Sequence, residues 1–396
     1  MKRTLGLTLL LFATLFSCMR QEKPLPAELS RAESVMWEHP DSALSILRSM
    51  PQSSLSIGKN YATWALLLAQ ARDKVYGKRL PDSLNIPSSD KLVQDAMDYF
   101  EKEGDLKRMA QTYYYKGQLL KDQKKITEAM PFFLKSKEMM TKLDEPLFTY
   151  LICQSLGNMY RYQDLYEESL VQLKDAYQYA LRSGNGERIS YALSELGRTY
   201  VHKNEMDSAL FYFGKSLDNA QRLGNIELEA MAMGELGVVY NKLSQGEKAL
   251  HYTRKELDLC LQISSLHKLP QVYYKIGSAF WSLGQLDSAK VYFQKSLETD
   301  NLYTLNEAYE VLYYICVEQK LYKEAIEYNN QYLIYSDSLQ VINHAGELAE
   351  IQARYDHERL LNINNQLKLE KTNQEIIGLF VTAVLLILII VYQYRV

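Results

Sequence analysis

A glycine with a large residue three positions later recurs along this chain at one spacing, and leucine or isoleucine precedes the glycine in every copy but the first, weaker one. The glycines of the phrase lie forty residues apart at Gly117, Gly157, Gly197, Gly237 and Gly277. The third position holds, in the same order, Leu120, Tyr160, Tyr200, Tyr240 and Phe280. A fixed period in this range is typical of repeat arrays, so we expect the chain to grow by stacking units rather than by adding separate globular domains.

Each period contains two segments with helical character. The second segment begins with Asp207-Ser208-Ala209 in one copy, and Asp-Ser at this place supplies side-chain oxygens for the free amides of a first helical turn. Ala209 and Phe213 are four residues apart, so they share one helix face. Gly197 of the first segment has no Cβ and admits a partner helix, at ~1 kcal/mol of helix propensity. The pattern predicts an all-α chain of helix pairs.

These residues resemble the tetratricopeptide repeat family, in which Leu-Gly and Tyr mark helix A and Ala, Phe and Ala mark helix B. The helix B alanine is present at Ala129, Ala209, Ala249 and Ala289 and is relaxed to Ser169. The period is six residues longer than the usual 34 of the family. The resemblance implies a right-handed α-solenoid of helix hairpins, and it says little about the ligand.

We expect seven segments along the chain. They are a lipoprotein-type signal peptide (1–18), a tether (19–27), degenerate N-terminal helix pairs (28–104), five forty-residue repeats (105–302), a degenerate C-terminal pair (303–340), a long stalk helix (341–375) and one transmembrane helix (376–394).

The N-terminus has the pattern of a secretory signal. A short basic start, Lys2-Arg3, precedes a dozen apolar residues from Leu5 to Phe16, which is too short to span a bilayer comfortably. The last four residues, Leu15-Phe16-Ser17-Cys18, resemble the lipobox of bacterial lipoproteins. That resemblance implies lipidation of Cys18; the alternative is an ordinary signal peptide with an incidental cysteine.

The C-terminal run 376–392 carries no charge and is followed by Gln393 and Tyr394. At about 1.5 Å per residue it covers most of a ~30 Å hydrocarbon layer, which predicts a membrane span. Lys368 and Lys371 precede the run and only Arg395 follows it, and this distribution mildly opposes the orientation that an exported N-terminus implies. A cytoplasmic tail-anchored protein therefore stays as the rival topology.

The polar segment before this run resembles the juxtamembrane stalk of repeat-bearing bacterial membrane regulators of the histidine-kinase or DNA-binding type. Leu360, Ile363 and Leu367 form a narrow apolar stripe that suits either a short coiled coil between two copies or packing on the array. Four residues follow the span, too few for an output domain. This departure leaves open a regulator whose output domain is missing or separately encoded.

Motifs for catalysis are not apparent in the sequence. It shows no phosphate-binding glycine loop, no His-Glu-x-x-His and no Gly-x-Ser-x-Gly nucleophile elbow. The six histidines and four cysteines are scattered, without the spacing of a metal site. We therefore expect neither a catalytic residue nor a metal or cofactor. The net charge of −3, without a basic stripe, also argues against nucleic acid.

In the family that the chain resembles, helix A side chains not used in packing line a concave groove. Counting from the repeated glycines, we expect the partner-binding residues to be Tyr114, Gln118, Lys121, Gln154, Asn158, Arg161, Tyr162, Ser194, Arg198, His202, Asn241, Lys242, Tyr274 and Trp281. Amides and cations in a row suit an extended peptide or a chain carboxylate. The alternative is that these are ordinary solvated residues.

The sequence thus favours a non-enzymatic, membrane-anchored binding protein of the bacterial cell envelope. Its repeat domain would face the periplasm from the inner membrane and hold a protein or peptide, as a scaffold or as a sensor. The alternatives are the sensory part of a signalling or transcription regulator without its output domain, and a cytoplasmic tail-anchored adaptor.

Overall fold

The computed structural model describes residues 25–51, 55, 58–76, 88–340 and 345–395. The chain is an all-α helical repeat solenoid; 86% of the described residues are helical and none of them lies in a strand. The prediction of stacked helix pairs is therefore confirmed. The chain folds as two compact units, residues 1–116 and 117–396, which are described separately below.

The first unit contains α2 (Ala27–Val35), α3 (Pro40–Ser49), α4 (Lys59–Tyr76), α5 (Ser89–Glu103) and most of α6 (Leu106–Asp122). Its core is apolar, because Leu29, Leu66 and Phe100 are completely buried. The side chain of Ser88 accepts a hydrogen bond from the Lys91 amide and caps α5, and burial of one α5 face fixes this helix against α4.

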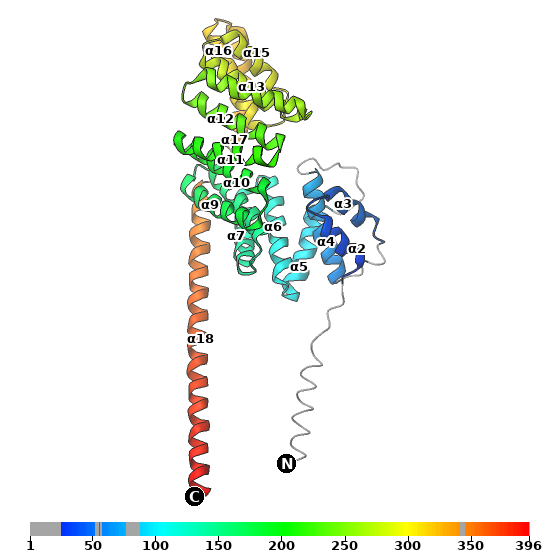
Figure 1. The fold of residues 1–396 in the computed structure, drawn as a ribbon, viewed down its shortest axis with the longest axis vertical. Coiled ribbons are helices and arrows are strands. Elements are labelled where there is room, and N and C mark those ends of the chain that lie inside the picture. Colours follow the sequence, from blue (N-terminus) through cyan, green and yellow to red (C-terminus); the bar gives the residue numbers. More distant parts are fainter. Residues whose placement is uncertain (1–24, 52–54, 56–57, 77–87, 341–344, 396) are drawn as a thin grey trace. The chain divides into compact units, whose positions relative to one another are not determined.

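The second unit contains the rest of the array. Its helices are α7 (Ile126–Lys142), α8 (Pro146–Arg161), α9 (Tyr166–Ser183), α10 (Gly186–His202), α11 (Met206–Leu223), α12 (Ile226–Lys242), α13 (Gly246–Gln262), η2 (Leu266–Lys268), α14 (Leu269–Ser282), α15 (Leu286–Ser296), α16 (Leu302–Glu318), α17 (Tyr322–Gln340) and α18 (Ala345–Arg395). Successive helices from α8 to α17 pack as hairpins (Figure 1).

Turns with left-handed backbone follow one another every twenty residues. Gly184, Gly224 and Gly284 have positive φ, and the non-glycine residues in the same turn position are Lys124, Asp144, Asp164, Asn204, Ser244 and Ser264. Each forty-residue period therefore consists of two helix-and-turn segments of equal length. A left-handed residue satisfies the free carbonyls of a helix end, which is why each helix stops there.

The repeated glycines mark the closest approach of the two helices within a pair. A Cβ on Gly197 would lie 2.5 Å from the ring of Phe213, and one on Gly157 would lie 2.6 Å from Leu173. The aromatic residues that follow Gly197, Gly237 and Gly277 stack on the second helix, as Tyr200 does on Tyr212 with ring centroids 5.3 Å apart. The recurring phrase is thus a packing device, as the sequence predicts.

The first helices of successive pairs form the inner layer of the array. Helices α8, α10, α12, α14 and α16 contact one another in this order. Among the described residues the second helices, such as α9 and α11, make no comparable contact with each other. An array of this kind curves toward the layer that is in contact, so the inner surface is lined by the first helices.

The predicted stalk and the predicted membrane span form one continuous helix, α18 (Figure 1). Within the part of the chain that the structure describes, no helix is long and apolar enough to cross a membrane. Charged residues recur along α18 up to Glu375, so the helix as a whole is not apolar. The predicted transmembrane helix at 376–394 is wrong.

The predicted inner-membrane location, with the array facing the periplasm, depended on that span and is wrong with it. The tail-anchored alternative depended on the same helix. The signal peptide, Cys18 and most of the tether lie outside the described residues.

Candidate partner-binding groove

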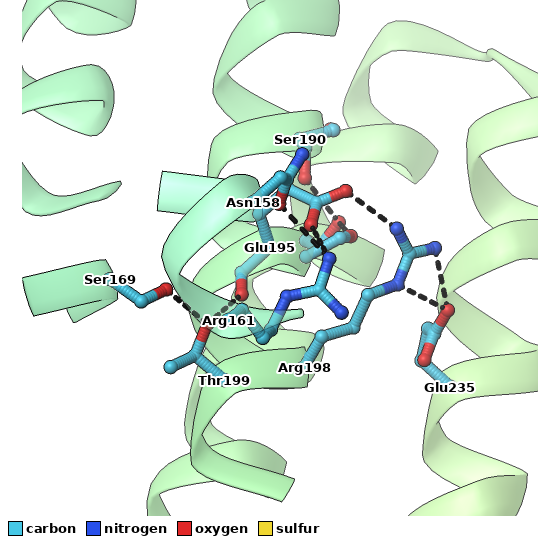
Figure 2. A network of polar contacts seen from close by, with 10 residues as sticks. Asn158, Arg161, Ser169, Ser190, Glu195, Arg198, Thr199 and Glu235 are labelled. Carbon is cyan, nitrogen blue, oxygen red and sulfur yellow. Dashed lines mark hydrogen bonds and ion pairs between the residues drawn. The ribbon is translucent and has the colours of Figure 1, made fainter. Parts of the chain in front are cut away.

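A ladder of buried charges runs along the inner surface from α8 to α12 (Figure 2). Arg161 donates to the Glu195 carboxylate at 2.8 Å and to the Asn158 amide oxygen at 3.0 Å. Arg198 bridges Glu195 at 2.6 Å and Glu235 at 2.7 Å. Charge pairs and hydrogen bonds at this distance offset the cost of burying the ionised groups.

The charges of this ladder reinforce one another. Burial opposes ionisation of Glu235, but attraction to Arg198 and Lys275 outweighs it and lowers the pKa of Glu235. Burial likewise acts to lower the pKa of Arg198, but Glu235 and Glu195 raise it. Arg161 and Arg198 therefore already have carboxylate partners within the chain, so the basic bias of the predicted groove is neutralised.

A second buried pair continues the ladder at α13 and α14. Lys275 donates to Glu256 at 2.7 Å. Glu256 occupies the helix B position that holds Ser216 and Ser296 in other pairs, and a Cβ on Gly234 would lie 2.2 Å from its carboxylate. The missing side chain at Gly234 thus makes the room that Glu256 fills. Burial raises the pKa of Glu256, against the attraction of Lys275.

A cavity of about 330 Å³ lies beside this pair on the inner surface. It is lined from four successive first helices by His202, Asn241, Lys242, Tyr274, Ser278 and Glu307, together with Lys275 and small apolar groups. The structure thus brings together His202, Asn241, Lys242 and Tyr274 of the predicted set. No ion pair of Lys242 is recorded among the described residues, although its charge lies near Glu307.

The titratable groups of the cavity differ in charge state. Burial, and the cations Arg161 and Lys242, lower the pKa of His202, so its imidazole is neutral at pH 7. Burial raises the pKa of Glu307 against a hydrogen bond from Tyr274. Burial and Glu307 both raise the pKa of Tyr274, which keeps its hydroxyl protonated. The cavity therefore offers a cation, a carboxylate and neutral hydrogen-bonding groups.

An aromatic contact joins the two ends of this inner surface. Tyr162 at the end of α8 stacks on Tyr303 at the start of α16, with ring centroids 5.6 Å apart and planes 27° apart. The Arg161 guanidinium lies 4.8 Å from the Tyr162 ring centroid. Both tyrosines are about half exposed, so the contact is accessible from solvent.

The other predicted groove residues lie apart from the cavity. Ser194 is buried between helices, where its hydroxyl meets that of Ser216 at 2.9 Å. Tyr114 is buried and packs edge-on against Tyr115. Trp281 is 39% exposed on α14. Gln118, Lys121 and Gln154 are half-buried on α6 and α8.

Sequence reasoning missed Glu195, Glu235, Lys275 and Glu307. The first three occupy one position, two residues before the repeated glycine, which the pattern assigned to packing. A signal was present, because Glu195 and Arg198 have the spacing of neighbours on one helix face. No comparable signal was present in the sequence for Glu307, because the last helix pair lacks the Leu-Gly phrase from which positions were counted.

The family model of the tetratricopeptide repeat matches residues 110–139 and 270–301. No curated protein sequence matches this chain. With the helix pairs described above, these matches show that the chain carries tetratricopeptide repeats.

Solved structures support the fold. A Rap protein complexed with competence and sporulation factor is similar over 80% of this chain and 98% of its own, with a TM-score of 0.57 and 12% identity. The apo form of RapI is similar over 83% and 98%, with a TM-score of 0.54 and 13% identity.

A signal transduction ATPase with a tetratricopeptide repeat sensor, from Pyrococcus horikoshii, has a TM-score of 0.57 and 16% identity. The match covers 80% of this chain and 48% of that protein, so this chain spans about half of its length. At these identities the likeness shows the fold alone. A tetratricopeptide fold is typical of protein–protein interaction scaffolds.

Proposed function

We propose that the chain is a non-enzymatic scaffold that holds a protein or peptide segment on the inner surface of its second unit. The cavity lined by α10, α12, α14 and α16 is the anchor point. The proposal depends mainly on the position of Lys242 in the lining of this cavity. Arg161 and Arg198 are paired with carboxylates, whereas Lys242 points its charge at the cavity without a recorded ion pair in the described region. An acidic group of the partner would pair with it.

Two further features support this proposal. One similar array was solved with a bound factor, the Rap protein complexed with competence and sporulation factor. Among the described residues the thiols of Cys153, Cys260 and Cys316 are buried, and burial raises the pKa of Cys153 to about 12, so these three are poor nucleophiles.

Capture from the native source, followed by mass spectrometry, would test the proposal. Wild-type chain and Lys242→Glu would be compared, with Lys255→Glu as the matched control, since Lys255 is an exposed lysine on α13. We expect Lys242→Glu to weaken binding of the captured partner, measured by calorimetry with the purified segment, by at least about tenfold, or 1.4 kcal/mol. Equal binding by both variants would show that the cavity is not the anchor.

A sensor role is the second candidate, and one contact favours it. The Tyr160 hydroxyl, one residue from Arg161, donates to Gln352 of α18 at 2.6 Å. A partner that moves α8 would therefore shift α18, and a separately encoded output protein could read that shift. Hydrogen exchange of residues 345–356 with and without the captured partner measures this, and unchanged exchange would leave only the scaffold.

A homodimer through α18 belongs to the same proposal. Leu360, Ile363 and Leu367 are exposed along one stripe of this helix, with exposed fractions from 42% to 66%. Pairing with a second copy would cover them. Sedimentation equilibrium of wild type and Ile363→Lys tests this, and a monomeric wild type would exclude it.

A further inference from the structure

The last helix of the array exposes an apolar stripe. Tyr322, Ile326 and Leu333 of α17 are 61%, 63% and 49% exposed. These residues fall on one helix face, because their spacings of four and eleven positions return to nearly the same direction. Large apolar side chains gathered on one face of a helix mark an interface rather than ordinary surface.

The position of Ile326 is buried in three of the earlier pairs. Ala325 of α17 matches the helix B small residue of each repeat, so Ile326 corresponds to Met130, Leu170 and Leu250. Those three side chains are 1%, 4% and 5% exposed. Leu170 is buried in a cluster with Leu196 of α10, and Leu250 in a cluster with Ile276 of α14. In both clusters the covering element is the first helix of the next pair.

In α17 no such helix follows. The next helix, α18, packs on α7 instead, where the Tyr355 hydroxyl lies 3.1 Å from the Leu134 carbonyl oxygen and 2.8 Å from Glu138. Within the described part of the chain, α17 makes extensive contact only with α16. The outer end of a helical array is normally polar, so an open apolar end needs a partner.

We propose that this face, formed by Tyr322, Ile326 and Leu333, docks one amphipathic α-helix of another protein in the place of a next first helix. The internal interfaces define the occupant, because α14 is held on two sides by α12 and α13, as an added helix would be by α16 and α17. Its buried face would carry a leucine and a small residue, as α10 does with Leu196 and Ala192, which cluster with Leu170 and Ala176 of α9. This surface lies outside the proposed groove.

The neighbouring charges and helices further indicate what kind of partner covers this face. Two exposed charges of opposite sign, Asp337 and Lys323, lie closest to the stripe, so residues of both charges are favoured at the edge of the added helix. A second copy of this chain meeting α17 face to face would cover one narrow stripe on each side. Such a pair would lack the second contact that a first helix makes inside the array, as α14 does with α12.

A peptide copied from this chain is a defined probe. Residues 185–203 contain α10 with its Asn185 cap, and this helix covers Leu170 within the array. A fluorescein-labelled peptide of this sequence would be titrated with the full chain by fluorescence anisotropy. We expect saturable binding, and at least tenfold weaker binding to Ile326→Lys and to Leu333→Lys. The peptide with Leu196→Asp is the control and should not bind.

Lysine already occurs at both substituted positions in other helix pairs of this chain, so Ile326→Lys and Leu333→Lys should fold. Lys290 stands at the equivalent of Ile326 in α15, and Lys137 at the equivalent of Leu333 in α7. Circular dichroism should therefore show wild-type helicity for both. They should also retain the partner captured through Lys242, which separates this proposal from the groove.

Three results would overturn the docking proposal. They are the absence of saturable binding, equal binding by Ile326→Lys, and a wild-type dimer in sedimentation that Ile326→Lys converts to a monomer. The last result would assign the face to a second copy instead of a partner helix.

Discussion

At the residue scale, the two classes of helical glycine in this chain should respond oppositely to alanine. Gly197 faces the Phe213 ring at a distance that no Cβ tolerates, whereas Gly214 in α11 has nothing within 4 Å of a built Cβ. We expect Gly197→Ala to lower the free energy of unfolding by about 2 kcal/mol through overpacking. Gly214→Ala should raise it by about 0.5–1 kcal/mol through helix propensity. Urea denaturation measures both, and equal effects would refute the helix-crossing role of Gly197.

The ion ladder predicts a pH dependence at Glu235. The folded-state pKa of this carboxyl is lowered, so its stabilisation is present above the unfolded value of ~4.3 and is lost as the pH falls through the folded value. Glu235→Gln should therefore cost about 2 kcal/mol at pH 7. The cost should shrink below about pH 4.5. Denaturant unfolding of both proteins across this range measures it, and a cost independent of pH would contradict the assigned role.

The sequence predicts the packing residues better than the polar ones. Gly197, Leu196 and Tyr200 follow from periodicity, because close packing repeats the same solution in each pair. The carboxylate partners of Arg161 and Arg198 do not follow from periodicity, because an earlier repeat has Ser155 at the position that Glu195 and Glu235 hold in later repeats. Counting positions from the repeated glycine therefore selected the cations of the groove but not the carboxylates that pair with them.

At the element scale, the forty-residue period divides into two helix-and-turn segments of twenty residues each. Asn204 and Ser244 take the left-handed turn position that glycine takes at Gly184 and Gly224. Because most of these turn positions hold residues other than glycine, the twenty-residue spacing of the turns cannot be recognised from the glycines in the sequence. The helices themselves were predictable, because their apolar positions repeat at helical spacing.

The attachment of α18 gives a prediction for one element. Leu348 is completely buried, and Tyr355 is anchored on α7, whereas α18 beyond Tyr355 is largely exposed. Leu348→Asp places a charge in this contact and should release the first turns of α18. Hydrogen exchange measured by mass spectrometry should rise in residues 345–356 and stay unchanged in α10 and α12.

Tyr355→Phe removes only a hydroxyl and is the milder companion variant. It should cost about 1 kcal/mol or less at this contact. If Leu348→Asp instead raised exchange throughout the second unit, α18 would be part of the folding core and not an attached helix.

At the scale of the whole array, the apolar C-terminal run shows the limit of reading a chain by local composition. A window over 376–392 predicts a membrane span, but the structure continues the charged helix into it and shows no described segment that could cross. The curvature of the whole array also explains how the two ends of the inner surface come into contact. Tyr162 and Tyr303 come from α8 and α16, which are four pairs apart, and only the accumulated curvature of those pairs brings them together.

This contact predicts how the array opens. A stacked aromatic pair contributes about 1 kcal/mol, which is small enough for a partner to break when it enters the groove. Tyr162→Ala combined with Tyr303→Ala should therefore broaden and lengthen the distance between α9 and the turn after α15, measured by electron spin resonance between labels on Glu168→Cys and Glu298→Cys. A Cys18→Ala background avoids labelling that residue, and the other three cysteines are buried.

Tyr191→Ala is the control, because Tyr191 is 39% exposed and makes no recorded ring contact in the described region. It should leave the distance distribution unchanged. If the double variant also left it unchanged, the curvature would be held by the helix interfaces alone. Partner entry would then not depend on the tyrosine pair, and the variant should bind the captured segment at the wild-type rate. A faster association rate together with the longer distance would show that the stack limits access to the cavity.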